Sequence, residues 1–121
     1  MSYSSPHINT MFAAARQAGK KLVRDFGEVE NLQVSIKGVS DFVSAADIQS
    51  EKILINELSR AYPDYDILAE EAGFIKNSKT NSGMKWVIDP LDGTTNFLFG
   101  IPHFAISIAL QKDGETLSGI V

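Results

Sequence analysis

The sequence has no cysteine, no long apolar run and few basic residues. Without cysteine there is no disulfide scaffold, no thiolate zinc site and no thiol nucleophile. A membrane-spanning helix needs about 18 consecutive apolar residues, and the chain contains no such run. The 11 Lys and Arg residues stand against 15 Asp and Glu residues, giving a net charge of −4. This balance argues against a general nucleic-acid binder, which usually carries a basic face.

The 121 residues, 44% of them hydrophobic, suit one small domain and are too apolar for a disordered tail. The segment through Arg24 is basic without any acidic residue, which loosely resembles an organellar transit peptide. An ordinary first helix explains the same residues, and no secretory apolar core is present. We therefore expect a cytoplasmic mixed α/β domain that does not enter a membrane.

Apolar periodicity predicts two helices in the first half of the chain. The first runs from about Pro6 to Gly27, with Ser5 as its cap. The second opens at the capping-box pattern Ser44–Asp47 and ends at Tyr62–Asp64, because the residue before a proline disfavours helix. The apolar faces are expected to consist of Ile8, Met11, Phe12, Ala15, Leu22 and Phe26 in the first helix, and of Ile48, Ile55, Leu58 and Tyr62 in the second.

Short apolar or alternating runs predict the strands. They are 32–36, Asp66–Ala69, Lys85–Asp89 with a stop at Pro90, Phe104–Leu110, and Thr116–Val121 after a hairpin turn at Lys112–Glu115. Ala72–Met84, rich in Lys, Asn, Ser and Gly, is predicted to be a mobile loop. Trp86, Phe97, Phe99 and Phe104 are expected in the core. The sequence ends inside an apolar strand, so we expect the domain to continue beyond residue 121.

Carboxylates follow the ends of two predicted strands. Glu70 and Glu71 come after one strand, and Asp89 and Asp92 come at the end of another. Hard oxygen ligands of this kind suit Mg²⁺, which binds carboxylates together with water and phosphate. An Asp-Gly turn or a pair of surface glutamates alone would be unremarkable. The whole string from Trp86 to Phe97 is more specific and indicates phosphoryl-transfer chemistry.

That string, WVIDPLDGTTNF, together with AEEAG upstream, resembles the signature of the inositol monophosphatase family of Mg²⁺-dependent, lithium-sensitive phosphatases. The resemblance extends over nearly the whole chain, through INTMFAAARQAG at 8–19 and IKGVSDFVSAAD at 36–47. In style it is similar to the bacterial extragenic-suppressor (SuhB-type) branch. It implies an α+β fold, the layered αβ sandwich of inositol monophosphatases and sugar phosphatases.

The resemblance also implies residue roles. Glu70, Asp89 and the main-chain carbonyl of Leu91 would bind a first Mg²⁺, and Asp89 and Asp92 a second. Asp92 and the main-chain N–H groups of Gly93, Thr94 and Thr95 would bind the substrate. Thr94 and Asp47, with help from Glu70, would activate the attacking water. Lys37 and Glu71 would support these ligands. Asp47 is equally explained as a helix cap, and Lys37 as a solvated loop residue.

Members of that family are about twice as long, and their second half completes an αβαβα layering. It also supplies a further aspartate in a Trp-Asp motif, whereas here Trp86 is followed by Val87. Residues 1–121 are therefore expected to form the N-terminal part of such a domain. The resemblance implies two or three Mg²⁺ ions, lithium inhibition, a homodimer and a small phosphorylated polyol as substrate.

Two other hypotheses remain open. Asp-Gly-Thr also occurs in aspartyl-phosphate phosphatases of the haloacid-dehalogenase type, but those space their aspartates at i and i+2 near the N-terminus. Here the spacing is i and i+3 and the motif comes late. The other hypothesis is a catalytically incomplete relative that acts through protein contacts in transcription or ribosomal RNA maturation. The acidic balance favours a protein partner over direct RNA binding.

Overall fold

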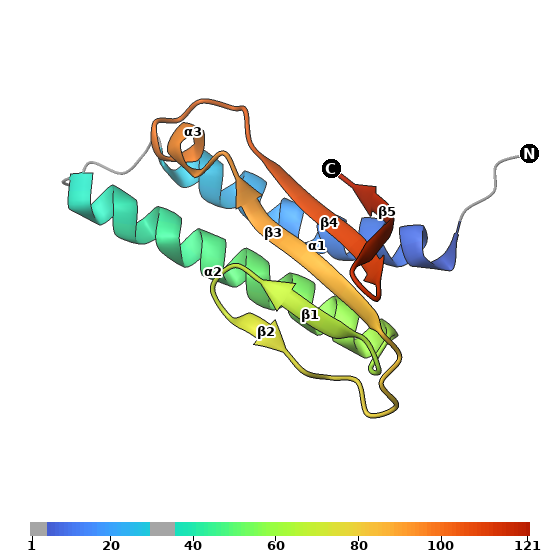
Figure 1. Cartoon of the computed structure of the whole chain (residues 1–121). Helices are drawn as coiled ribbons and strands as arrows, with labels where there is room; N and C mark the ends of the chain where they lie inside the picture. The colour runs from blue at the N-terminus through green and yellow to red at the C-terminus, as the bar shows by residue number, and fades with distance from the viewer. Residues whose placement is uncertain (1–4, 30–35) are drawn as a thin grey trace, which may run out of the picture.

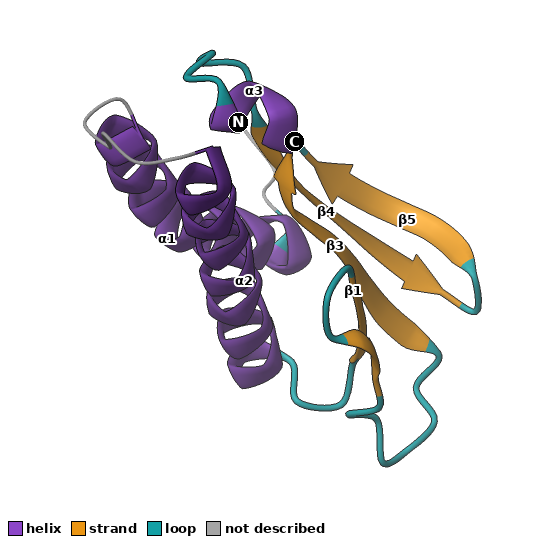
Figure 2. Ribbon diagram, turned by 90° about the vertical axis from the view of Figure 1, so that its left-hand side faces the viewer, coloured by secondary structure: helices purple, strands orange, loops and turns teal. Residues whose placement is uncertain are grey.

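Two long helices cover one face of a five-stranded sheet (Figures 1 and 2). The computed structural model describes residues 5–29 and 36–121. The sheet order is β2-β1-β3-β4-β5; β1 and β3 are parallel, and the other pairs are antiparallel. The elements are α1 (Pro6–Val29), α2 (Ile36–Ala61), β1 (Asp66–Ala69), β2 (Gly73–Ile75), β3 (Met84–Asp92), α3 (Thr94–Leu98), β4 (Ala105–Lys112) and β5 (Glu115–Ile120). This α+β layering confirms the expected fold class.

Helix α1 begins where the sequence predicts. The Ser5 hydroxyl accepts a hydrogen bond from the His7 backbone N–H at 3.1 Å, as a cap does. Most of the expected face is confirmed, since Met11 and Leu22 are buried and Ile8, Ala15 and Phe26 pack against the core. Phe12 is the exception at 49% exposed, and the small side chains of Ala14 and Ala18 are buried instead. Within the described residues, no helix is both long and apolar enough to cross a bilayer.

The predicted start of the second helix is wrong. Helix α2 begins at Ile36, so Ser44–Asp47 lie in its middle and form no capping box. Apolar residues before Ser44 continue the helical stripe and pack with Leu22, Phe97 and their neighbours in a second core cluster. That packing favours helix over a local cap. The predicted strand at 32–36 lies outside the described residues, apart from Ile36.

The buried stripe further along α2 is also shifted. Leu54 and Leu58 are fully buried, whereas Ile48 is 40% exposed. Ile55 and Tyr62 pack at the margin of the main core, so they are partly buried as expected. The helix ends at Ala61, just before Tyr62–Asp64, which confirms the predicted stop.

Strand β3 does not stop at Pro90 as predicted but continues to Asp92. Its pairing with β4 is irregular between Asp89 and Asp92, which accommodates a proline that has no N–H to donate. Trp86 and Phe97 are fully buried, as expected, but Phe99 is 71% exposed on the segment after α3. The predicted hairpin turn is confirmed, because Asp113 and Gly114 both have positive φ.

The segment from Ala72 to Met84 is not wholly irregular, since Gly73–Ile75 form β2 and pair with β1. Residues 77–80 of this segment form hydrogen bonds with two carboxylates, those of Asp64 and Asp66. We call these two residues the loop-anchor pair. Asp66 Oδ1 accepts backbone N–H groups from Asn77 and Ser78, both at 2.8 Å. Asp64 accepts the Lys79 N–H at 2.7 Å and also the Thr80 hydroxyl. Tertiary hydrogen bonds therefore order a segment that its composition marks as a loop.

Candidate metal and phosphate site

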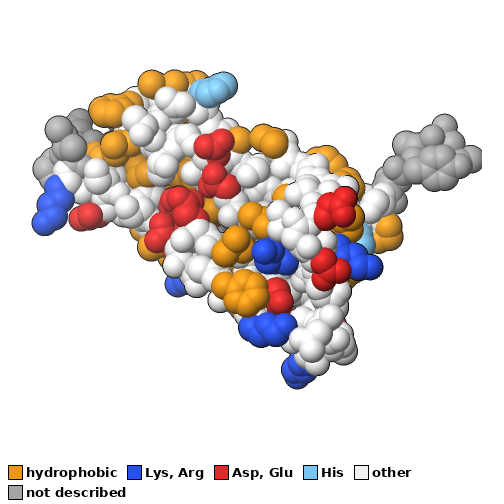
Figure 3. Space-filling model, viewed as in Figure 1, with side chains coloured by type: hydrophobic (Ala, Val, Ile, Leu, Met, Phe, Trp, Pro, Cys, Tyr) orange, Lys and Arg blue, Asp and Glu red, His pale blue; other side chains and the backbone are white. Residues whose placement is uncertain are grey.

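Acidic side chains from three elements converge at the edge of the sheet where β1 and β3 end. These strands are parallel neighbours, so their carboxyl ends share one edge, and the adjacent part of α2 adds two more acids. In Figure 3 acidic side chains gather over the ends of β1 and β3. We call this group the strand-end cluster; its members are Asp47, Glu51, Glu70, Glu71 and Asp89.

Asp47 is the most constrained member of the strand-end cluster. Its side chain is only 8% exposed, and its Oδ1 has no hydrogen-bond partner among the described residues. Its pKa is raised from the ordinary 3.8 to about 6, chiefly by burial and then by the negative charges of Glu70, Glu71, Asp89 and Glu51. A buried carboxylate oxygen without a donor is unfavourable in isolation and suits a ligand or a transferable proton.

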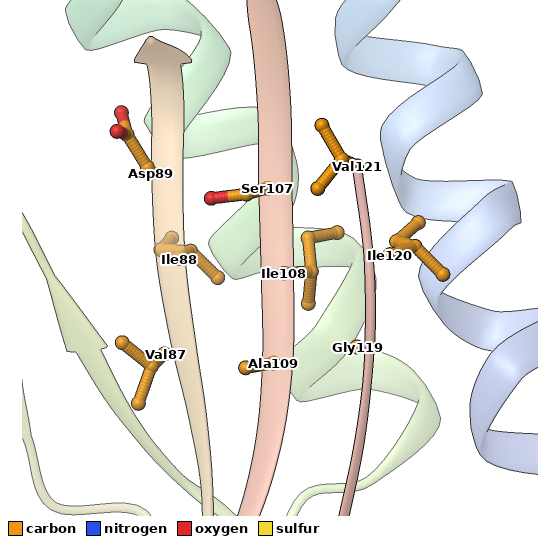
Figure 4. A pocket seen from close by; sticks show the side chains of 9 residues that line it. All are labelled: Val87, Ile88, Asp89, Ser107, Ile108, Ala109, Gly119, Ile120 and Val121. Atoms are coloured by element: carbon orange, nitrogen blue, oxygen red, sulfur yellow. The ribbon is translucent and has the colours of Figure 1, made fainter. Parts of the chain in front are cut away.

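Glu70 lies at the exposed rim of the cluster. Its pKa is raised, and partial burial is the largest cause. The charges of Asp89, Glu71 and Glu51 and a hydrogen bond with Asp89 contribute less. The close-up in Figure 4 shows the Asp89 side chain projecting from β3, where it helps to line a hollow of about 350 Å³. These carboxylates repel one another, so a bound cation would stabilise them together.

Asp89 also shapes the backbone after it. Its Oδ1 accepts the Leu91 N–H at 3.3 Å, and Leu91 itself is 2% exposed. Asp92 is exposed at the end of β3 and lines a hollow of about 500 Å³ with Gly93, Asn96 and His103. His103 is also exposed.

Gly93 makes the tight connection from β3 into α3. Its φ is +88°, and a Cβ there would lie 2.9 Å from the His103 carbonyl oxygen, so only glycine fits without displacement. Thr94 and Thr95 open the short helix α3. Both threonines are exposed and line a hollow of about 180 Å³ beside Val43 and Ser44. Thr94 therefore faces α2 about one helical turn before Asp47.

The structure brings the predicted acids Asp47, Glu70, Glu71 and Asp89 together. Asp92 and Gly93 line one separate hollow and Thr94 and Thr95 another, and Lys37 lies away from all of them. Lys37 is exposed in the first turn of α2, about 15 Å along the helix axis from Asp47. Glu71 contributes charge at the cluster, and its backbone N–H is bound by Glu51.

Glu51 is one of two residues near the site that the sequence analysis did not identify. It is 3% exposed, and its two carboxylate oxygens accept the backbone N–H groups of Glu71 and Ala72. One feature of the sequence could have identified it: Glu51 lies four residues after Asp47, so a charged residue occupies the helix face where an apolar residue would be expected. Ser50, also missed and 1% exposed, donates its hydroxyl to the Pro90 carbonyl at 2.7 Å.

The donor set fits a hard divalent cation in chemistry, because it consists of carboxylates around an unpartnered buried oxygen. Within 5–29 and 36–121, no three Asp, Glu or His side chains already form a group that could hold a metal. The residues therefore match such a cation in chemical type, although the described side chains do not form a ready-made group of three ligands.

Helices packed on one face of a mixed sheet, with carboxylates at the strand ends, define a layered α+β protein with an acidic site. The model of the inositol monophosphatase family matches residues 4–121, and the chain belongs to this family. It is 54% identical over 114 residues to an inositol-1-monophosphatase of Rhizobium meliloti (strain 1021), an alignment that covers 94% of this chain and 42% of that protein.

Two further similarities point to the branch expected from the sequence. The chain is 46% identical over 116 residues to the Nus factor SuhB of Xylella fastidiosa (strain Temecula1 / ATCC 700964), covering 96% of this chain and 41% of that protein. The crystal structure of the extragenic suppressor protein suhB from Bartonella henselae superposes with a TM-score of 0.80 at 46% identity, over 95% of this chain and 42% of that one. The chain thus spans less than half the length of these relatives.

Proposed function

We propose that this chain carries the metal- and phosphate-binding part of a Mg²⁺-dependent phosphatase that hydrolyses a small phosphate monoester. The observation that carries the proposal is the strand-end cluster, in which a buried Asp47 oxygen has no partner and like charges crowd together. The name of the 54% identical relative makes inositol 1-phosphate the first substrate to test.

Glu70, Asp89, Asp92 and the Leu91 carbonyl are the proposed metal ligands. When bound, Mg²⁺ supplies the positive charge that neutralises these carboxylates and polarises the phosphate. The hydrogen bond from the Leu91 N–H to Asp89 Oδ1 constrains the backbone between the two aspartates at the end of β3. Glu71 adds negative charge to the same edge.

Thr94 and Asp47 are proposed to act on the attacking water. The Thr94 hydroxyl orients the water, and the Asp47 carboxylate accepts its proton, a role that suits an acid with a pKa of about 6. The backbone N–H groups of Gly93, Thr94 and Thr95 bind phosphate oxygens, because the first N–H groups of a helix have no partner within it. Attack then occurs in line with the leaving alcohol.

Because the chain spans about 42% of the R. meliloti relative, we propose that residues 1–121 form the N-terminal part of the family's domain. The remaining part would supply the further aspartate and most contacts to the polyol. A cytoplasmic homodimer inhibited by lithium is the expected form of the whole protein.

The replacement Asp89→Asn tests the proposal. It removes the carboxylate that both proposed metal positions share, so we expect Mg²⁺ affinity, measured by isothermal titration calorimetry, to fall at least tenfold. Asp113→Asn, in the exposed β4–β5 turn, is the matched control and should bind like the wild type. Equal affinity for the wild type and Asp89→Asn would disprove the role of Asp89. Phosphate release from inositol 1-phosphate during a Mg²⁺ titration then tests turnover.

A second candidate function rests on the relative named Nus factor SuhB. Under it, the chain acts through protein contacts in transcription, with or without hydrolysis. A pull-down with the purified chain that recovers RNA polymerase or its elongation factors would support this function. Phosphate release without any such recovery would count against it.

A further inference from the structure

Three buried polar residues share one face of α2 in the middle of the helix. Asp47, Ser50 and Glu51 are spaced i, i+3 and i+4, so their side chains project from the same side toward the sheet. Their exposed fractions are 8%, 1% and 3%. Only the Asp47 oxygen lacks a partner, whereas Ser50 and Glu51 each bind backbone of a strand end.

Glu51 holds the chain just after β1. Its Oε1 accepts the Glu71 N–H at 2.9 Å, and its Oε2 accepts the Ala72 N–H at 3.0 Å. A carboxylate bound to two backbone donors is a strong, charge-assisted arrangement. Since both oxygens are occupied, Glu51 is not a free ligand. It fixes the backbone that directs the Glu70 side chain.

Ser50 holds the other strand end. Its hydroxyl donates to the Pro90 carbonyl at 2.7 Å, between Asp89 and the Leu91–Asp92 segment. This is the position at which β3 loses regular pairing with β4, so the sheet does not fix it fully. The helix therefore replaces the missing sheet contact.

We propose that Ser50 and Glu51 are positioning residues, which hold the two acid-bearing strand ends at a fixed separation opposite Asp47 so that a divalent cation binds between them. The inference rests on the proposed function and adds a structural basis for it. Adjacent residues of one helix form hydrogen bonds with the backbone at the ends of two strands. Partners of this kind, bound to the backbone beside metal ligands, typically change metal affinity about 10- to 100-fold when they are removed.

The test is Glu51→Gln in the 121-residue chain, read by calorimetric Mg²⁺ affinity and by amide hydrogen exchange. Glutamine keeps the shape but offers one acceptor and one donor, so one of the two N–H groups loses its bond. We expect about tenfold weaker Mg²⁺ binding and faster exchange at Glu71 or Ala72. Glu51→Asp retains the charge but is one methylene shorter, and we expect it to weaken binding as well.

Two controls separate positioning from charge and from stability, and Ser50→Ala is a second test. Glu57→Gln removes one negative charge from the same helix, where Glu57 forms an ion pair with the exposed Arg60, and should leave affinity unchanged. Ile55→Val should lower the melting temperature slightly without changing affinity. Ser50→Ala preserves all charges and should weaken binding severalfold; it keeps the inference testable if Glu51→Gln fails to fold.

The outcomes distinguish the two proposals. Unchanged affinity in folded Glu51→Gln and Ser50→Ala, with loss of binding in Asp89→Asn, overturns the positioning role but leaves the metal site standing. Absence of Mg²⁺ binding by the folded wild type overturns both for this chain. Equal weakening in Glu51→Gln and Glu57→Gln identifies a charge effect and overturns the positioning role.

Discussion

The two ends of β1 carry carboxylates of opposite character. At its amino end, the loop-anchor pair accepts hydrogen bonds from backbone N–H groups and from Thr80. The Thr80 hydroxyl and the Lys79 N–H hold the pKa of Asp64 below its ordinary value. At the carboxyl end, the strand-end cluster contains an oxygen without a partner, and the pKa values of Asp47 and Glu70 are raised.

This contrast distinguishes structural acids from acids available for chemistry. For Asp66, partial burial favours the neutral form, but the N–H groups of Ser78 and Asn77 and the charge of Lys76 outweigh it and lower the pKa. Asp47 is buried too, yet other acids surround it instead of donors. Burial raises the pKa of both carboxylates, and the neighbours decide the net direction: donors and a cation reverse the rise at Asp66, whereas other acids add to it at Asp47.

The largest effect on stability is expected from Asp66→Ala. Two partly buried N–H groups lose their acceptor, which costs about 2 kcal/mol in free energy of unfolding. Urea denaturation measures the loss. Asp66→Asn retains one acceptor oxygen and should lose about half as much. A loss below about 0.5 kcal/mol for Asp66→Ala would contradict a structural role for this carboxylate, because the loop would then not depend on the hydrogen bonds that Asp66 accepts.

The opposite sign is expected for Asp47→Asn without a cation. Because the folded-state pKa of about 6 exceeds the ordinary 3.8, Asp47 stabilises the fold only when protonated, and this contribution disappears as pH rises through 6. Above that pH the variant should be about 1 kcal/mol more stable than the wild type, after allowance for solvent screening. Well below pH 4 the two should converge.

Denaturation across this pH range checks the sign, and Asp66→Asn is the matched control. The pKa of Asp66 is lowered, so its contribution is present above 3.8 and is lost as pH falls. The deficit of Asp66→Asn should therefore develop as pH rises toward 3.8 and then stay constant, whereas the gain of Asp47→Asn should develop between pH 3.8 and about 6. If the free energy of unfolding changed with pH in the same way for both variants, the proposed difference between Asp66 and Asp47 would be wrong. Added Mg²⁺ should favour the wild type over Asp47→Asn.

The smallest effect is expected from Lys76→Ala. Its ion pair with Asp66 is long, at 3.4 Å, and Lys76 is 54% exposed. Such pairs contribute less than about 0.5 kcal/mol. Thermal melts at low and high salt should therefore nearly coincide with those of the wild type. A larger loss would show that the cation, more than the backbone donors, sets the behaviour of the loop-anchor pair.

Sequence reasoning succeeds here where the signal is local. Ser5 caps α1, the proline after Tyr62 coincides with the end of α2, and Asp113-Gly114 form the hairpin turn. It fails where packing overrides a local preference. Ser44–Asp47 have the composition of a cap, but the apolar residues around them pack against α1 and α3 and continue the helix. Pro90 is tolerated in β3 because the pairing is irregular there.

The sequence by itself determined the family, the acids at the strand ends and the Gly93 turn, because each depends on neighbouring residues along the chain. Only the tertiary structure decided that α2 crosses those strand ends with Asp47, Ser50 and Glu51 facing them. Long-range packing sets the position and rotation of a helix, and no residue next to Glu51 in sequence specifies that its carboxylate binds backbone 20 residues away.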